Sequence, residues 1–397
     1  MLDFTEEERM AQQAIRSFCA QHLEPKVLAM EAGELSVYPT MREMAATFGI
    51  PDMVRASFAR AKEKGDAGGP SKGIGKNAGM MAILTMELSR VCPGFALAFG
   101  ATLGLFAGGV MARGTLEQKE RWALPVLTMD KIGAWGLTEP GAGSDAFGSM
   151  KTHAKKAEGG WRISGSKTFI TNAPFADVFL IYARLVGDGF APGDVRAFIV
   201  ERTDKGLTSG PPMKKMGMHA SPTGEVFLDD VFVPDERLLG GVATENARTA
   251  AKSSLNQERF GMTPMCLGMV DRCLEESIKY AKEREQWGKP IASFQLVQEK
   301  IARIYTARTL MQAMLMRQLE AEKENFPLTG KEASATKLYC ARMTTECALE
   351  AVQIMGGAGY MTGSVVEMMA RDAKLFQIGG GTDEIQILRI ARELLEA

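Results

Sequence analysis

Histidine is scarce in this sequence. Only three histidines occur in 397 residues, His22, His153 and His219, and none of them has the spacing of a metal-ligand pair. Metal sites in proteins usually draw their ligands from closely spaced histidines, cysteines and carboxylates. The sequence therefore argues against a metalloenzyme, and no metal ligand is expected.

Cysteine is also sparse, and none of the six cysteines forms a CxxC pair. Two pairs of them are spaced by seven residues, which places both members of a pair on one face of a helix. Such cysteines are expected to be small core residues, and this usage suits a reducing compartment. The six are Cys19, Cys92, Cys266, Cys273, Cys340 and Cys347.

Neither sign of charge is in excess, because 47 Lys and Arg face 48 Asp and Glu and give a net charge of −1. This balance provides no electrostatic reason to expect nucleic acid or an anionic membrane as a partner. The first residues, MLDFTEEERM, are acidic and are typical neither of a secretory signal nor of an Arg-rich transit peptide. A cytoplasmic protein is expected, or one of the mitochondrial matrix if the source is eukaryotic.

One uncharged run, Gly94–Ala112, is long enough to span a membrane. Gly100, Gly104 and Gly108 even have the GxxxG spacing of membrane helix pairs. A membrane span and a helix buried in a large bundle are both open from the run alone. The number of glycines, the absence of aromatic belts and the polar remainder of the chain favour the buried helix, so no membrane span is expected.

Three regions differ in their hydrophobic pattern and predict an α+β fold. Residues 1–131 have helical spacing and are expected to form an all-α domain. Residues 132–242 carry short runs rich in Val, Ile, Phe and Tyr and are expected to form a β-barrel or sandwich, and residues 243–397 return to helical spacing as a bundle. The expected strands are Trp161–Ile170, Val178–Leu185, Arg196–Glu201 and Glu225–Val233.

The loop Thr138–Asp145, TEPGAGSD, is the most distinctive local motif. Together with Ala146 it formally matches G-x-G-x-x-A, but Pro140 intervenes and the residues that follow read as strand and turn rather than helix. A dinucleotide-binding βαβ unit is therefore excluded. The loop is either an ordinary turn or, because it offers glycines, hydroxyls and backbone N–H groups together, a cradle for a polar ligand.

Six stretches, in this order along the chain, resemble the acyl-CoA dehydrogenase family. Each is weak alone, but the ordered set covers nearly the whole length and is specific. They are WGLTEPGAGSD (135–145), GSKTFITNA (165–173), VFLDDVFVPDERLLG (226–240), REQWGKPIASFQ (284–295), QIMGGAGY (353–360) and GGGTDEIQ (379–386).

The resemblance implies an FAD enzyme in which the C-terminal region is a four-helix bundle and the subunits form a tetramer. It also implies a CoA thioester as substrate and an electron-transfer flavoprotein as acceptor. Arg284 and Gln295 resemble residues that reach the FAD of a neighbouring subunit; a lone Arg284 would otherwise be read as a solvated charge. The other residues that look like cofactor contacts are Trp135, Leu137, Thr138, Gly143, Ser144, Phe169, Thr171, Gln353, Gly357, Thr382 and Glu384, with Ser144 also near substrate.

The glycine loop lacks the catalytic base that many members of the family carry. Gly380 stands where a Glu removes the α-proton, and Gly379 stands where an aromatic residue is common. A minority, which includes isovaleryl-CoA and long-chain acyl-CoA dehydrogenases, carries the base on a neighbouring helix, immediately before an Arg. Glu258 and Arg259 match that position, so Glu258 is expected to be the base, although a surface Glu–Arg pair is the alternative. Pro264 suggests that this helix is kinked or begins late.

The remaining roles follow from the same resemblance. The Gly380 N–H is expected to polarise the thioester carbonyl, and Arg259 to shape the CoA or carbonyl end. Two glycines at 379 and 380 leave room, which makes a branched or bulky acyl group plausible. Glu139 and Asp145 are expected to structure their loop. The glycine-rich segment 61–76 departs from the family pattern, so the acyl chain length stays open.

The expected reaction is α,β-desaturation of an acyl-CoA, with α-proton abstraction by Glu258 and β-hydride transfer to flavin N5. Three alternatives stay open: an enoyl-CoA reductase of the crotonobetainyl-CoA reductase type, a related flavin oxidase or desulfinase, and a non-catalytic subunit of a mixed tetramer.

Overall fold

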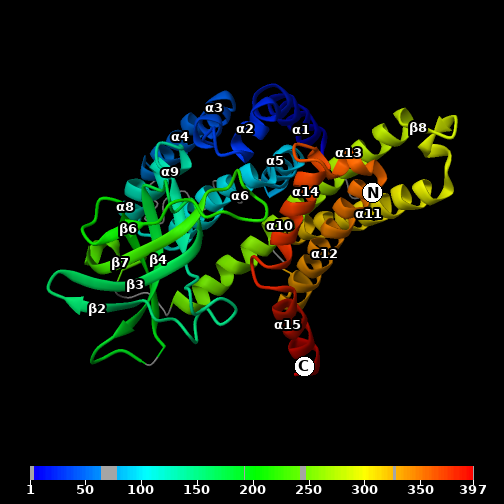
Figure 1. The fold of residues 1–397 in the computed structure, drawn as a ribbon. Helices are drawn as coiled ribbons and strands as arrows, with labels where there is room; N and C mark the ends of the chain where they lie inside the picture. Colours follow the sequence, from blue (N-terminus) through cyan, green and yellow to red (C-terminus); the bar gives the residue numbers. More distant parts are fainter. Residues whose placement is uncertain (1–3, 64–77, 192, 242–246, 325–327, 397) are drawn as a thin grey trace.

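The computed structural model describes residues 4–63, 78–191, 193–241, 247–324 and 328–396, with side chains for all of them except 247–259. Along the chain, a β-sheet region lies between two helical regions, and Figure 1 shows the sheet at one side of the molecule; this confirms the expected α+β architecture. The domain limits at 131/132 and 242/243 stay predictions. Residues 64–76 of the expected loop 61–76 lie outside the described residues, and 61–63 end a helix.

The N-terminal region is a layer of helices. The first begins at a capping box, in which the Thr5 hydroxyl accepts from the Glu8 N–H and the Glu8 carboxylate accepts from the Thr5 N–H. Shorter helical turns connect the helices of this layer. Its helices are α1 (Glu6–Phe18), α2 (Val27–Glu31), α3 (Tyr38–Thr47), α4 (Ile50–Glu63), α5 (Ala78–Val91), α6 (Pro93–Gly100), α7 (Gly108–Arg113), α8 (Leu116–Gln118) and α9 (Leu124–Leu127).

The long uncharged run is a core helix. Helix α6, the π-helical turn Ala101–Ala107 and α7 together form one helical segment, Pro93–Arg113, that could cross a membrane by length and composition, but 61% of its most apolar window is buried inside the protein. Phe95 and Phe106 are completely buried. A β-carbon on Gly133 in the sheet would stand 2.6 Å from the Phe106 ring, so this close packing requires glycine there.

The central region is one mixed sheet of seven strands. The strand order is β1-β4-β2-β3-β7-β6, and β5 pairs with the other edge of β4. Strands β1 and β2 both run parallel to β4, whereas β3 and β7 form a long antiparallel pair. The four expected strands are present as β3, β4, β5 and β7. All seven are β1 (Gly133–Gly136), β2 (His153–Ala157), β3 (Gly160–Thr171), β4 (Val178–Val186), β5 (Val195–Glu201), β6 (Leu207–Ser209) and β7 (Thr223–Pro234).

The C-terminal region is a bundle built on three long helices. Helix α10 (Ala247–Glu283) packs against α5, α11 (Gln295–Lys323) and α12 (Gly330–Met355). The expectation of a late start for α10 is wrong, because the helix runs without a break through Pro264. Residues 262–270 are buried between α5 and α12, and this packing outweighs the one hydrogen bond that proline removes.

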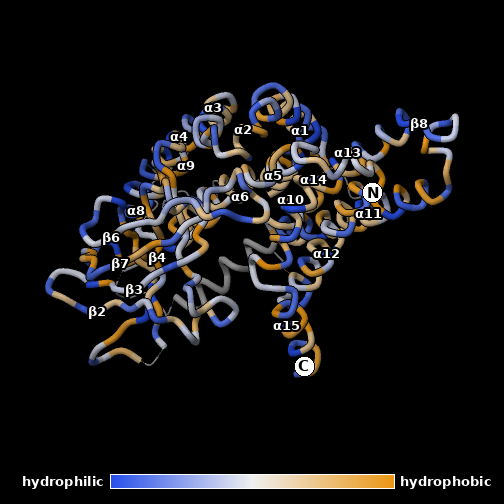
Figure 2. Tube along the Cα trace, in the orientation of Figure 1, coloured by the Kyte–Doolittle hydropathy of each residue, from blue (hydrophilic) through white to orange (hydrophobic). Residues whose placement is uncertain are grey.

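All six cysteines are buried and free, as expected, and four of them lie in α10 and α12. A short hairpin of β8 (Glu285–Gln286) and β9 (Lys289–Pro290) joins α10 to α11. The chain ends with α13 (Gly357–Tyr360), α14 (Val365–Ala373) and α15 (Asp383–Leu395). Figure 2 shows α15 projecting from the body with both hydrophobic and hydrophilic turns.

Candidate active site

A buried ion pair fixes the TEPGAGSD loop. Glu139 Oε1 lies 2.8 Å from Lys167 Nζ, and both side chains are almost inaccessible to solvent. The same carboxylate accepts hydrogen bonds from the backbone N–H groups of Lys151 and Thr152, at 2.6 and 2.9 Å. Burial alone would raise the pKa of Glu139, but the charge and hydrogen bonds of its partners outweigh burial and lower it. Glu139 therefore structures the loop, as expected.

The loop lies directly beside the second expected flavin contact. The Thr168 N–H donates to the Thr138 carbonyl at 2.9 Å, and Lys167 Nζ donates to the carbonyl of the buried Leu137 at 3.1 Å. The β3–β7 register shifts between Lys167 and Ile170, and Phe169 is thereby left at φ +57° with 67% of its surface exposed. A large aromatic side chain in the left-handed region, turned outward on a bulged strand, is a conformational outlier of the kind found at functional sites.

Trp135 and Thr171 complete this group. Trp135 lies on β1 and packs edge-on against Tyr182, with ring centroids 5.3 Å apart. Its indole nitrogen is buried but has no hydrogen-bond partner in the described protein. A buried N–H donor without an acceptor costs free energy unless a ligand supplies one. Thr171 is half-buried at the end of β3.

The tip of the loop is exposed. A β-carbon on Gly141 or Gly143 would meet no atom of the chain within 4 Å, and Ser144 is open to solvent. Asp145 accepts hydrogen bonds from the Gly148 N–H at 3.0 Å and from a serine hydroxyl at 2.7 Å, which supports its expected structural role. The loop thus presents glycines and a hydroxyl outward from a fixed base.

Asn172 is a positioning residue that the sequence reasoning missed. It is the second-last residue of the motif GSKTFITNA, directly after β3, with φ +67°, and is completely buried. Its amide nitrogen donates to the Ala98 carbonyl and the Thr102 hydroxyl, and its amide oxygen accepts from the Tyr38 hydroxyl at 2.9 Å. The end of β3 is therefore tied to the N-terminal helices. Only the left-handed tolerance of Asn at a strand end could have signalled this role.

The glycine loop between α14 and α15 is the second group. Gly380 and Gly381 have φ +62° and +93°, so this backbone requires glycine at both positions. Thr382 caps α15 by accepting from the Ile385 N–H, and Glu384 is fully exposed beside it. The hydrogen bond from its own backbone N–H, and then that with the Thr382 side chain, hold the pKa of Glu384 below its usual value.

Helix α10 faces this loop. The Met262 methyl group lies 3.7 Å from the position that a β-carbon on Gly379 would take, and Leu375 borders the same space at 3.5 to 4.0 Å. Glu258 lies in α10 four residues before Met262, hence on the same helix face. The side chains of Glu258 and Arg259 lie outside the described residues.

The third group of expected cofactor residues lies away from the TEPGAGSD loop and the glycine loop. Arg284 and Gln295 flank the β8–β9 hairpin and are exposed, as are Gln353 and Gly357 near the end of α12. Figure 1 shows the hairpin at one extremity of the molecule and the β-sheet at the other. One chain therefore does not bring Arg284 and Gln295 to the TEPGAGSD loop.

The described residues fit FAD. An exposed aromatic ring on a bulge, a buried indole N–H without an acceptor and an open glycine loop lie together on β1, β3 and the segment between β1 and β2. A flat ring system with polar edges could cover the exposed aromatic ring and accept the hydrogen bond of the indole N–H. It could also approach the backbone of the glycine loop closely. No group of three potential metal ligands occurs among the described residues.

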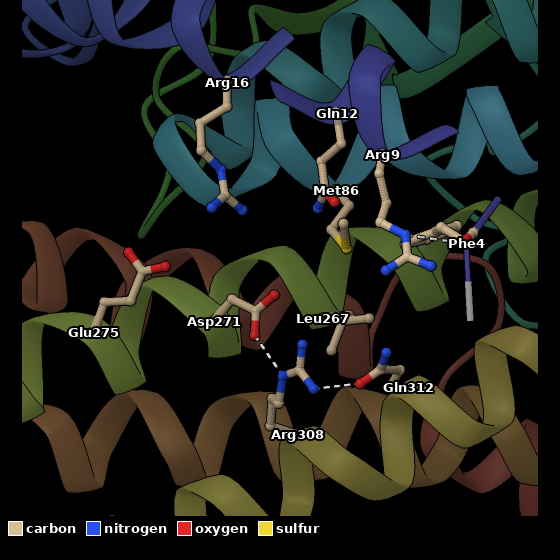
Figure 3. A pocket seen from close by; sticks show the side chains of 10 residues that line it. All are labelled: Phe4, Arg9, Gln12, Arg16, Met86, Leu267, Asp271, Glu275, Arg308 and Gln312. Atoms are coloured by element: carbon tan, nitrogen blue, oxygen red, sulfur yellow. Dashed lines mark hydrogen bonds and ion pairs between the residues drawn. The ribbon is translucent and has the colours of Figure 1, made fainter. Parts of the chain in front are cut away.

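A separate cavity of about 300 Å³ between α1, α5, α10 and α11 contains none of these residues (Figure 3). Its charged side chains bond to one another or to residues just behind it. Arg308 Nε lies 2.8 Å from Asp271 Oδ1, and Arg16 lies 2.8 Å from Glu87. Burial raises the pKa of Asp271, and the charge of Arg308 opposes that rise. These contacts stabilise the packing of the helices.

The comparisons with known proteins agree with this geometry. The family models for the N-terminal, middle and C-terminal domains of acyl-CoA dehydrogenases match residues 5–130, 134–231 and 248–395. A probable acyl-CoA dehydrogenase of Bacillus subtilis (strain 168) is 34% identical over 99% of this chain and 99% of its own length. A mitochondrial isovaleryl-CoA dehydrogenase of Arabidopsis thaliana is 34% identical over 78% of this chain and 75% of its own length.

A solved structure is similar over the whole chain. The acyl-CoA dehydrogenase of Bacillus anthracis complexed with FAD is 30% identical and superposes with a TM-score of 0.85, covering 99% of this chain and 68% of that one. The fold, the FAD-compatible group of residues and the three family models lead to one conclusion. The chain belongs to the acyl-CoA dehydrogenase family, FAD-dependent oxidoreductases that act on the CH–CH group of CoA thioesters.

Proposed function

We propose that this protein desaturates an acyl-CoA between its α- and β-carbons, with Glu258 as the base that removes the α-proton. The observation that carries this proposal is the position of the Met262 methyl group, 3.7 Å from where a β-carbon on Gly379 would stand. It sets one face of α10 against the glycine loop, and Glu258 occupies that face one helical turn earlier. Position 380 itself holds no side chain, so the proposed carboxylate comes from another element, and α10 lies beside the loop at Gly379.

The glycine loop has a role in the same step. When the α-proton leaves for the Glu258 carboxylate, the electron pair of the C–H bond moves toward the thioester carbonyl, whose oxygen becomes negative. A backbone N–H aimed at that oxygen stabilises this charge. The Gly380 N–H is the proposed donor, because the positive φ values of Gly380 and Gly381 turn the loop sharply at this point. When bound, FAD supplies the acceptor for the β-hydrogen and its two electrons.

The acyl group is proposed to be branched or bulky. A β-carbon at Gly379 would meet Met262 and Leu375 only at ordinary van der Waals distances, so the chain leaves this volume unfilled. A methyl branch of the substrate fits a space of this size, and burial of each methyl or methylene group contributes about 0.8 kcal/mol. The similarity to an isovaleryl-CoA dehydrogenase supports this choice.

The oligomer is proposed to complete the cofactor site. Arg284 and Gln295 are exposed and remote from the TEPGAGSD loop of their own chain, so they can serve only the FAD of another copy. A guanidinium suits a pyrophosphate because it donates two parallel hydrogen bonds. We propose a homotetramer of the family type, an electron-transfer flavoprotein as acceptor, and the cytoplasm as location, where buried free thiols stay reduced.

The decisive experiment is anaerobic titration of the flavin absorbance with straight, branched and cyclic acyl-CoAs. Bleaching by one class of saturated thioester is expected in the wild type, with branched substrates preferred. Glu258→Gln should slow it at least about 10²-fold, the lower range for loss of a general base. Glu158→Gln, in the exposed turn between β2 and β3, is the matched control and should bleach normally.

Three results would contradict the proposal. Equal bleaching in Glu258→Gln would remove Glu258 as the base. Absence of bleaching by every saturated thioester, with reoxidation of the reduced enzyme by an enoyl-CoA, would identify a reductase. A purified protein that binds no flavin would identify a non-catalytic subunit.

A further inference from the structure

A buried lysine on α12 donates a hydrogen bond to the backbone of the glycine loop. The Lys337 side chain, on α12, is only 1% exposed. Its ammonium donates to the Gly381 carbonyl at 2.8 Å and lies 3.9 Å from Asp383 Oδ1. Lysine is rarely buried to this degree, because removing an ammonium from water is costly unless hydrogen bonds and nearby charge compensate. Because burying the Lys337 ammonium costs free energy, we expect the contacts that this side chain makes to have a function.

A buried glutamine fixes the same peptides. Gln386 Nε2 donates to the Gly380 carbonyl at 3.2 Å and to the Gly381 carbonyl at 2.9 Å, and the side chain is completely buried. Lys337 and Gln386 thus hold the two carbonyls that follow the Gly380 N–H. Because peptide units are planar, fixing these carbonyls restricts the orientation of the loop that carries the proposed donor.

We propose that Lys337 positions the glycine loop and stabilises, through its buried positive charge, the negative oxygen that forms on the substrate carbonyl at the Gly380 N–H. The proposal rests on the function proposed above. Lys337 acts through the loop and by electrostatics across it, so it is a positioning residue and makes no contact with the reacting atoms.

The charges around Lys337 favour this role. Asp383 is shared, since Arg342 Nε also donates to its other oxygen at 2.9 Å. In these contacts two cations share one carboxylate, and Glu384, which also interacts with Arg342, is fully exposed, so water screens its charge. The thiol of Cys266, on α10, also faces Lys337, but burial raises its pKa to about 12, so the thiol stays neutral. In a buried site of low dielectric, a positive charge behind the loop acts on the developing enolate far more strongly than it would in water.

The test measures the acidity of a bound substrate analogue. Acetoacetyl-CoA carries an acidic α-proton and forms an enolate that absorbs in the ultraviolet, so its pKa on the holoenzyme can be read by titration without any redox step. The wild type should lower this pKa relative to the free thioester. Lys337→Met should raise the bound pKa by about one unit, a tenfold weaker stabilisation of the enolate. Lys337→Arg should restore most of the wild-type value.

Two further variants make the result specific. Lys331→Met, six residues earlier on α12, should leave the bound pKa unchanged. Asp383→Asn removes the shared negative charge and should shift the bound pKa in the opposite direction, downward. This second variant tests the electrostatic claim even if Lys337→Met does not fold. In steady state, Lys337→Met should lower kcat several-fold more than it changes KM.

The outcomes separate this inference from the proposed function. If Lys337→Met only weakens binding or stability, with the bound pKa unchanged, or if Asp383→Asn raises it, Lys337 is merely structural and the inference is overturned. If the wild type neither lowers the pKa of acetoacetyl-CoA nor is bleached by any saturated thioester, the proposed function itself has failed.

Discussion

The methyl group of Met262 lies 3.7 Å from the point where a β-carbon on Gly379 would stand. Met262 thereby places α10 beside the glycine loop, where Gly379 and Gly380 carry neither a carboxylate nor a bulky side chain. Under the proposed function, acyl selectivity and catalysis depend on the same pair of elements, and substitutions there should separate the two.

Gly379→Ala should narrow the acyl site without unfolding the protein. The new methyl group would meet Leu375 and Met262 at 3.5 to 4.0 Å, and Gly379 does not have a positive φ. The ratio of kcat/KM for a branched over a straight acyl-CoA should fall about tenfold, as expected for losing room for one methyl group. An unchanged ratio would show that this space does not hold the acyl group.

Gly380→Ala is the contrasting variant. Its φ of +62° is in the left-handed region, where a β-carbon costs roughly 1–2 kcal/mol. Thermal unfolding should therefore show a clear loss of stability in Gly380→Ala and little or none in Gly379→Ala. Equal stabilities would mean that the loop relaxes freely, which would contradict its fixation by Lys337 and Gln386.

Lys167→Met should destabilise the TEPGAGSD loop. The variant leaves the Glu139 carboxylate buried without its cation, and breaking a buried pair in this way costs about 3–5 kcal/mol. Chemical unfolding should show this loss, and FAD should dissociate more readily. In Lys156→Met, where the lysine on β2 and its partner Asp235 just after β7 are both well exposed, unfolding should change little.

Asp372 should make stability depend on pH. The residue is completely buried, and burial together with the charge of Glu31 raises its pKa to about 7, although Arg371 and the Met218 N–H oppose the rise. A pKa raised above its unfolded value of 3.8 contributes stability that is fully present below pH 3.8 and is lost as pH rises to about 7.

The measurement is the unfolding free energy of wild type and Asp372→Asn between pH 5 and pH 8. The neutral amide cannot titrate, so the wild type should lose stability relative to the variant by about 1.4 kcal/mol per pH unit up to about pH 7. Beyond that the difference should level off. Parallel profiles would show that Asp372 does not titrate in this range.

Trp287→Ala should weaken self-association rather than the fold of one chain. Trp287 is 86% exposed at the tip of the β8–β9 hairpin, and its ring touches Phe294 edge-on with centroids 5.5 Å apart. Sedimentation of Trp287→Ala should therefore show species smaller than the wild-type oligomer.

Arg284→Met should lower FAD affinity about tenfold or more, because it removes a charge-assisted contact. A tetramer that keeps its FAD affinity in both variants would contradict the proposed sharing of the site.

Local patterns predicted the architecture well. Helical and strand periodicities located the three regions, and the glycine content of Gly94–Ala112 correctly favoured a core helix. The short strands β1 and β6 were missed, because they have only four and three residues and take their form from pairing with distant strands. Strand β2 lies in the stretch that was read as strand and turn, but it was given no bounds of its own. Pro264 suggested a late start for α10, because proline usually disrupts a helix locally. The helix nevertheless continues through it, because packing against α5 and α12, which are distant in sequence, stabilises it.

The sequence also predicted only part of the candidate site. Motifs identified the loops, but the residues that fix those loops come from elsewhere in the chain. Asn172 bonds to Ala98, and Lys337 bonds to Gly381, contacts that no short motif encodes. The roles of Glu258 and Arg259 stay predictions, supported by the register of α10.

The most direct test of the central claim is exchange of the substrate α-protons. Wild type and Glu258→Gln would be incubated anaerobically, in D2O, with a thioester that has α-hydrogens but no β-hydrogen to lose, and the recovered CoA ester analysed by mass spectrometry. If Glu258 is the base, the wild type incorporates deuterium at the α-carbon and Glu258→Gln does so at least about 10²-fold more slowly. Equal exchange in both would show that another group removes the proton.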